Sequence, residues 1–200
     1  MKPIQPRTFS QLSQLDVVSP GCMTEHLRLY AGYVERYNQL AASLGRLQRA
    51  GAAEAGADVE SVKVDLTFAL GAVKNHELFF DVLGLAGESR APGGALGEAI
   101  TGAFGGFGQF LSDLRQTAIA GAGWAWTAYD LDYGHLFNYS GARNGMPVWN
   151  AAPILAIDLY GHAYLYDFGE NKGAYVDAVV ACLNWGRIGQ RFEAAQSRSF

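Results

Sequence analysis

Two long stretches of helical periodicity, separated by a short break, constrain the fold of this chain most strongly. Apolar and aromatic residues recur at steps of mostly three and four between about residues 23 and 49, and again between about 59 and 83. The segment Gly51-Ala-Ala-Glu-Ala-Gly56 interrupts the pattern. Because this connection is short, we expect the two helices to pack as an antiparallel hairpin. Residues 1–20 carry three prolines and no steady period, which predicts an extended arm lying on the body.

The hydrophobic period changes to two after Gly121-Ala-Gly123. Segments 124–129, 136–139 and 154–158 are predicted strands, while 96–103, 106–120, 172–183 and 185–195 are predicted helices. The glycine-rich stretch 85–97 is the clearest loop. The expected fold class is therefore α+β, with an N-terminal α-helical hairpin and a C-terminal α/β lobe that holds a small three-stranded antiparallel sheet. The expected units are 1–84 (arm and hairpin) and 85–200 (C-terminal α/β domain).

The composition excludes several classes of partner. Half of the 200 residues are apolar, which is ample for a buried core, and the formal net charge is -4. Lys and Arg are scattered, so neither nucleic acid nor an anionic membrane is an expected partner. No apolar run approaches the length of a bilayer span, and no export signal is visible, so we expect a cytoplasmic protein. Cys22 and Cys182 form no C-x-x-C pair and are expected to be reduced thiols.

Several side chains of the kind that bind metals occupy helical or strand-end positions. Asp158 and His162 stand four residues apart where a predicted strand meets a helix. His76 lies among apolar residues of the second helix, His26 lies near the start of the first, and His135 lies in a predicted turn. A single buried histidine is more often a hydrogen-bonded structural residue than a ligand. The combination of nitrogen and oxygen donors nevertheless suits iron, manganese or zinc better than thiophilic metals.

Five short motifs follow one another along the chain: Asn75-His76-Glu-Leu-Phe-Phe, Phe104-Gly-Gly-Phe107, Gly123-Trp-Ala-Trp126, Asp158-Leu-Tyr-Gly-His162-Ala-Tyr164 and Leu183-Asn-Trp185. In this order and at about this spacing they resemble the iron/manganese superoxide dismutase family, over nearly the whole chain from about residue 23 to 192. The resemblance implies the fold predicted above and one Fe or Mn ion held between the lobes by three His and one Asp. It also implies that the substrate is superoxide, which is converted to dioxygen and hydrogen peroxide.

The resemblance assigns three ligand positions directly, namely His76, Asp158 and His162. The ligand on the first helix has two candidates, because the family places its active-site tyrosine eight residues after the ligand. Here Tyr33 follows His26 by seven, and an alignment made from the tyrosine points to Glu25 instead. Positions i and i+7 of a regular helix lie within about 20° of each other. We therefore favour His26 over Glu25, with Tyr33 facing the same site.

The surroundings of the expected site depart from the family pattern. Relatives hold a glutamine near the metal from one of two positions, which here are Ala72 and Asn144. Asn144 is thus the expected active-site amide beside Tyr33, and its shorter side chain would change the outer hydrogen bonds that tune a metal. An aromatic wall is expected to exclude water and larger anions; its members are Tyr33, Phe80, Trp124, Trp126 and Tyr160.

The residues that join two subunits in the family are also changed. The glutamate before the last ligand is Gly161, and the tyrosine and histidine that pair across the interface correspond to Leu165 and to Leu29 or Tyr30. We therefore expect a monomer, or an oligomer that uses another surface. The alternative to an active enzyme is a superoxide-dismutase-like metal-binding protein without dismutase activity, because a fold and its function can separate.

Overall fold

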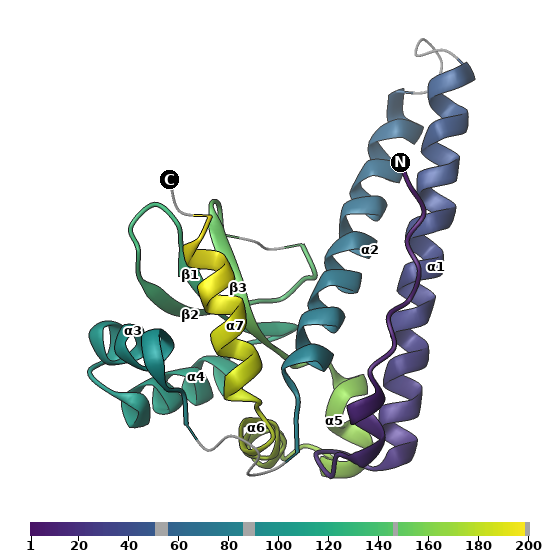
Figure 1. Ribbon diagram of the computed structural model, residues 1–200. Coiled ribbons are helices and arrows are strands. Elements are labelled where there is room, and N and C mark those ends of the chain that lie inside the picture. The colour runs from purple at the N-terminus through teal and green to yellow at the C-terminus, as the bar shows by residue number, and fades with distance from the viewer. Residues whose placement is uncertain (51–55, 86–90, 146–147, 199–200) are drawn as a thin grey trace.

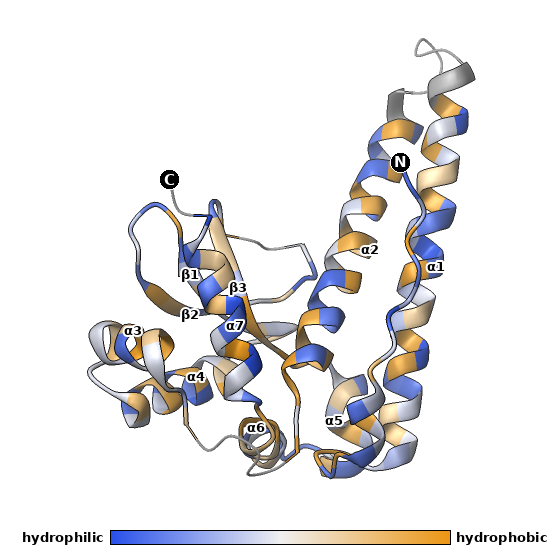
Figure 2. Ribbon diagram, in the orientation of Figure 1, coloured by the Kyte–Doolittle hydropathy of each residue, from blue (hydrophilic) through white to orange (hydrophobic). Residues whose placement is uncertain are grey.

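The computed structural model describes residues 1–50, 56–85, 91–145 and 148–198. Helix α1 (Pro20–Ala50) and helix α2 (Gly56–Val82) run side by side in opposite directions and form the predicted hairpin (Figure 1). Most of the predicted break at 51–56 lies outside the described residues. Figure 2 shows hydrophobic and hydrophilic bands alternating along both helices, as amphipathic helices packed on one side require.

The C-terminal lobe contains a three-stranded sheet with helices around it (Figure 1). Its elements are α3 (Gly94–Phe104), α4 (Phe107–Ala120), β1 (Trp124–Asp130), β2 (Leu136–Gly141), β3 (Ala151–Asp158), α5 (Gly161–Phe168), α6 (Lys172–Ala181) and α7 (Trp185–Gln196). The strand order is β2-β1-β3, and both pairs are antiparallel. The α+β prediction is therefore confirmed. All residues of the central strand β1 except the last are buried, while α4 packs on β1 and β2 and α7 packs on β3.

Strand β3 begins at Ala151, earlier than the predicted start at Ile154. The early start includes Pro153, which lacks the N–H that a sheet ladder uses. Strand β3 tolerates this proline because it is an edge strand and because the register with β1 shifts between Thr127 and Ala128, next to the proline. Prolines in sheets are confined to such edge and bulge positions.

The N-terminal arm lies along the hairpin, as predicted, and ends in the short 3-10 helix η1 (Ser10–Gln14) (Figure 1). The Asn38 side chain accepts a hydrogen bond from Ile4 N at 2.9 Å and donates one to Ile4 O at 2.9 Å. Arg7 N donates to the Tyr30 hydroxyl at 2.8 Å. Side chains of α1 thus hold the backbone of the arm in place.

The end of α2 is joined directly to the C-terminal lobe. Gly84 N donates to Cys182 O, and Asn184 N donates to Val82 O, each at 2.8 Å. Residues 86–90 of the predicted boundary loop lie outside the described part of the chain, so a division at 84/85 stays a prediction.

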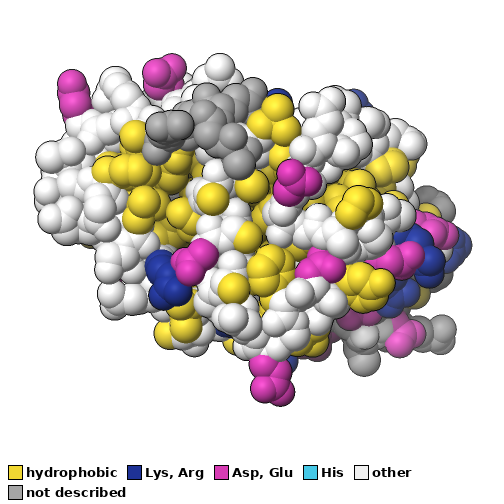
Figure 3. All heavy atoms as spheres, turned by 90° about the horizontal axis from the view of Figure 1, so that it is seen from below, with side chains coloured by type: hydrophobic (Ala, Val, Ile, Leu, Met, Phe, Trp, Pro, Cys, Tyr) yellow, Lys and Arg dark blue, Asp and Glu magenta, His cyan; other side chains and the backbone are white. Residues whose placement is uncertain are grey.

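On the face seen in Figure 3, the larger groups of Lys and Arg lie beside Asp or Glu, so this face carries no continuous basic field. Among the described helices, none combines the length and apolar character that crossing a membrane requires.

Candidate metal centre

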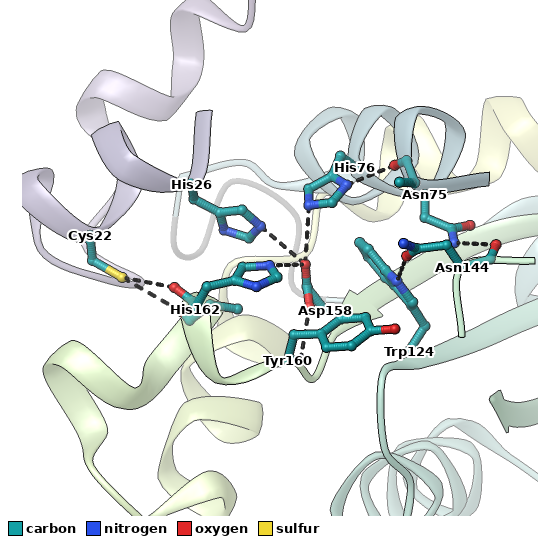
Figure 4. A network of polar contacts seen from close by, with 11 residues as sticks. Cys22, His26, Asn75, His76, Trp124, Asn144, Asp158, Tyr160 and His162 are labelled. Atoms are coloured by element: carbon teal, nitrogen blue, oxygen red, sulfur yellow. Dashed lines mark hydrogen bonds and ion pairs between the residues drawn. The ribbon is translucent and has the colours of Figure 1, made fainter. Parts of the chain in front are cut away.

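Four side chains from four different elements converge where the hairpin meets the sheet (Figure 4). They are His26 near the start of α1, His76 in the last third of α2, Asp158 at the end of β3 and His162 in the first turn of α5. One potential ligand atom from each lies within 4.8 Å of all the others. The Nε2 atoms of His26 and His162 are each 3.1 Å from Asp158 Oδ2, and that of His76 is 3.4 Å away.

The carboxylate of Asp158 is fixed by the backbone around the strand end. Asp158 is the register partner of Trp124, and the next residue, Leu159, donates its N–H to Gly123 O at 2.8 Å. Tyr160 N donates to Asp158 Oδ1 at 2.9 Å, which leaves Oδ2 for the three imidazoles. Gly123 has φ +79°, and a Cβ there would lie 2.6 Å from Gly141 O. This turn therefore requires glycine.

His76 has the protonation state that a metal ligand needs. Its Nδ1 donates to Ala72 O at 2.7 Å, which leaves the lone pair of a neutral ring on Nε2. That Nε2 is buried and has no hydrogen-bond partner among the described residues. Burial lowers the pKa of His76 to about 4, although the negative charge of Asp158 acts in the opposite direction. A buried nitrogen lone pair without a donor, facing a carboxylate, fits a bound cation.

Asp158 supplies the negative charge of the cluster. The side chain is fully buried, and burial alone would raise the pKa of its carboxyl group. Hydrogen bonds with His162 and His26 outweigh this effect and hold the pKa below its usual range. The cluster thus presents one anionic oxygen ligand and three imidazoles, a donor set suited to iron or manganese.

The structure places His26 and Glu25 on different sides of α1. His26 is 2% exposed and faces the cluster, whereas the Glu25 side chain is 69% exposed and pairs with Arg28 at 3.5 Å on the surface. Since successive residues of a helix point about 100° apart, only one of the two can face the interior. The four-residue cluster therefore contains His26.

Aromatic rings surround the imidazoles on several sides. Phe80 lies 5.0 Å from the His26 ring, and Trp124 lies 5.1 Å from the His76 ring in an edge-to-face arrangement. Tyr160 stacks on His162 at 5.6 Å, with the ring planes 13° apart. Trp126 belongs to the next layer and stacks on Trp124 at 6.4 Å. These rings cover a cluster in which His26, His76 and Asp158 are buried and His162 is partly exposed.

Tyr33 and Asn144 lie beside the cluster. The Tyr33 ring is 5.6 Å from the His76 ring. Burial raises the pKa of Tyr33, the Asn144 amide beside it lowers that pKa, and Asp158 raises it. Asn144 is 5% exposed, and its Oδ1 accepts a hydrogen bond of 2.6 Å from Trp124 Nε1. At the other expected amide position, Ala72 contributes its carbonyl to His76.

A surface cavity of about 560 Å³ reaches the centre from outside. The side chain of His162 is 32% exposed at this cavity, in contrast to the buried rings of His26 and His76. Its lining residues are Glu25, Arg28, Leu29, Gly32, Tyr33, Arg36 and His162. The opening therefore combines access to one imidazole with two guanidinium groups, each paired with a carboxylate: Arg28 with Glu25 at 3.5 Å and Arg36 with Asp65 at 2.9 Å.

Two residues around the cluster were not singled out as site residues from the sequence. Asn75 donates through Nδ2 to Asn144 O at 3.1 Å and accepts from Trp126 Nε1 at 3.2 Å. A Cβ on Gly71 would lie 2.3 Å from Asn144 O. The available signals were the asparagine directly before a ligand histidine and a glycine inside a helical pattern, which often marks a close backbone approach.

Comparison with known proteins gives the same family over the whole chain. Residues 92–191 match the family model of iron/manganese superoxide dismutases, C-terminal domain. The iron superoxide dismutase of Aquifex aeolicus is 32% identical over 197 residues, which cover 96% of this chain and 92% of that protein. The manganese superoxide dismutase of Corynebacterium diphtheriae is 37% identical over 145 residues, covering 71% of this chain and 72% of that protein. With these matches and the clustered His and Asp side chains, the chain belongs to the iron/manganese superoxide dismutase family.

Proposed function

We propose that this protein is a superoxide dismutase that works with one Fe or Mn ion. The proposed ligands are His26, His76, Asp158 and His162. The observation that carries the proposal is the convergence of three imidazole nitrogens on Asp158 Oδ2, with His76 Nε2 buried and without a hydrogen-bond partner among the described residues. When bound, the ion supplies a centre that alternates between the +2 and +3 states, accepting an electron from one superoxide and returning it to another.

The residues around the centre have separate tasks in this reaction. Two superoxide ions and two protons give one dioxygen and one hydrogen peroxide. Superoxide is a small anion, and the cavity beside His162 gives it a way to the partly exposed imidazole of the cluster. Tyr33 retains its proton at neutral pH because its pKa is raised, so Tyr33 Oη can donate a hydrogen bond or a proton to the reduced product.

Neutral imidazoles and one carboxylate suit both oxidation states of either metal. A single anionic ligand limits the preference for the +3 ion, while nitrogen donors bind the +2 ion as well. The relatives support both choices, since one is named an iron enzyme and another a manganese enzyme. The proposal therefore specifies Fe or Mn, and elemental analysis identifies which one this chain selects.

The proposal includes an antioxidant role in the cytoplasm. Cys22 and Cys182 are both free and buried, which favours a reducing compartment over an oxidising one. For the state of assembly, we propose a monomer, or an oligomer that forms through a surface other than that of the family dimer. Gly161 offers no side chain to a partner, and Leu165 is 52% exposed.

The test measures bound metal and superoxide removal in the purified full-length protein. We expect one Fe or Mn per chain and an activity that scales with metal content. The His76→Ala variant should lose both, whereas His135→Ala, a histidine outside the cluster, should keep both. Metal at full occupancy without activity would support the inactive metal-binding alternative, and the absence of Fe and Mn from folded protein would refute both readings.

A further inference from the structure

We propose that Asn75 and Tyr160 are positioning residues that, together with Gly71, clamp segment 142–145 against the metal centre. This clamp fixes the amide of Asn144 beside Tyr33. Its catalytic consequence rests on the proposed dismutase function, but the clamp itself is a property of the folded chain. The segment follows the end of β2 and carries Asn144 into the interior, where the side chain points toward the ligand cluster (Figure 4).

Asn75 holds the segment from α2. Its Oδ1 accepts a hydrogen bond of 3.2 Å from Trp126 Nε1, which orients the amide group. Its Nδ2 then donates to the backbone carbonyl of Asn144 at 3.1 Å. Because Asn75 precedes His76 in the chain, the same turn of helix positions a proposed ligand and the backbone of the neighbouring segment.

Tyr160 holds the segment from the opposite side. Its hydroxyl donates to Ala142 O at 3.0 Å, and its ring stacks on His162. The backbone N–H of the same residue binds Asp158 Oδ1. Tyr160 therefore links two proposed ligands to the segment that carries Asn144.

Gly71 permits the close approach of α2 and the segment. A Cβ at this position would lie 2.3 Å from the carbonyl oxygen of Asn144 and 2.9 Å from its carbonyl carbon. Both atoms belong to the backbone, so no side-chain rotation relieves the clash. Glycine inside a helix is less favourable than alanine. Its presence here is explained by the space that the Asn144 backbone occupies.

The segment needs such contacts because open space lies behind it. A cavity of about 500 Å³ is lined by Gly71, Asn75, Trp126, Asn144 and Gly145, among others. None of the four proposed ligands lines this cavity. Without the clamp, we expect the segment to shift into this space and to weaken the 2.6 Å bond from Trp124 Nε1 to Asn144 Oδ1.

The first test follows the indole proton of Trp124, which reports on the position of Asn144. The exchange of this indole proton with solvent is measured by NMR in the full chain loaded with diamagnetic zinc. The Trp124→Phe variant assigns the resonance, because its spectrum lacks that signal. The Asn144→Ala variant lacks the acceptor of this proton, so it gives the exchange rate in the absence of the Trp124–Asn144 hydrogen bond. We expect Asn75→Ala and Tyr160→Phe each to speed exchange roughly five- to tenfold toward that limit, the effect of one lost hydrogen bond. Tyr166→Phe changes a side chain that is 80% exposed and should have no effect.

A matched pair of glycine variants tests the close approach. Gly71→Ala should lower the melting temperature and speed exchange of the Trp124 indole proton. Gly189→Ala, also inside a helix but with no atom within 4 Å of the new Cβ, should leave exchange unchanged and the melting temperature equal or higher. Equal behaviour of the two variants would overturn the role of Gly71.

Kinetics test whether the positioning residues act through Asn144. In the enzyme with full metal content, Tyr160→Phe should lower kcat more than it changes KM. In the Asn144→Ala background, the same substitution should have no further effect on kcat. Equal losses in both backgrounds, or wild-type exchange of the Trp124 proton in Asn75→Ala and Tyr160→Phe, would overturn the proposal. A wild-type protein without dismutase activity would refute the proposed function, while the exchange measurements would still decide whether the clamp exists.

Discussion

Asp158 is the residue on which the arrangement of the centre depends. One of its carboxylate oxygens faces three imidazoles, and the other accepts the N–H of Tyr160. The sequence motifs predicted the type of these side chains and their placement at a strand end and on helices. They did not predict the tautomer of His76, because that depends on a bond to Ala72 O one turn earlier in the same helix. The choice between His26 and Glu25 likewise needed the rotation of α1 relative to the sheet.

The pKa of His76 predicts how the metal-free protein responds to acid. An unfolded histidine has a pKa of 6.5, and that of folded His76 is about 4. Between these values the unfolded chain binds more protons, so stability is fully present above pH 6.5 and falls as the pH drops toward 4. The loss is on the order of 3 kcal/mol. The carboxyl group of Asp158 affects the pH dependence of stability over a lower pH range. Its pKa is lowered in the folded protein, so the stability that it contributes is lost only at more acidic pH.

Urea unfolding of the metal-free protein between about pH 7 and about pH 4 measures this dependence. The His76→Gln variant removes the titrating group and should show a flatter profile over the same interval. A wild-type profile as flat as that of the variant would contradict the assignment of a buried neutral imidazole.

At the level of secondary structure, α2 both supplies one proposed ligand and contacts the segment that carries Asn144. Gly71, Asn75 and His76 lie on consecutive parts of it and contact the segment after β2 or the cluster. Helical periodicity predicted α1, α2, α3, α4, α6 and α7 closely, whereas for α5 it predicted only a helix after Asp158, without bounds. The start of β3 was predicted too late, because the edge position and the bulge that tolerate Pro153 are properties of the assembled sheet. The segment 142–145 has no regular period, so the expectation that Asn144 lies beside the cluster came from the family resemblance and not from periodicity.

The arm depends on α1 for its place, which gives a prediction for Asn38. Asn38→Ala removes the two hydrogen bonds to Ile4 and should destabilise the protein by about 1–2 kcal/mol. Urea unfolding and limited proteolysis within the arm measure the effect. Gln39→Ala is the matched control, because its amide bonds to Glu35 within the same helix. Equal stability of the two variants would show that the arm does not rely on Asn38.

In the whole molecule, the cluster lies between the hairpin and the C-terminal lobe. His26 and His76 come from the hairpin, while Asp158 and His162 come from the lobe. A bound ion would therefore connect the two parts and stabilise their packing. Removing the metal with a chelator should lower the melting temperature. An ion present at about 100 times its dissociation constant contributes about 2.7 kcal/mol. Calorimetry with and without metal tests this, and identical melting curves would contradict a bridging ion.

The surface around the opening predicts the state of assembly. Tyr30 is 1% exposed, and its hydroxyl donates to Glu77 at 2.9 Å, so it points inward rather than toward a partner. The resemblance places the subunit-pairing residues of the family at positions 161 and 165, which are glycine and leucine here. Sedimentation equilibrium should give either the 21.5 kDa of one chain or an assembly that leaves the opening beside His162 free. A stable dimer that covers the opening beside His162 would contradict this prediction.

The most direct test of the central claim is the decay of superoxide measured by stopped-flow in the presence of the purified protein. Superoxide decay should accelerate in proportion to bound Fe or Mn, and in the presence of His76→Ala it should be no faster than in buffer. Decay at the buffer rate with wild-type protein fully loaded with either metal would contradict the claim that this centre dismutates superoxide.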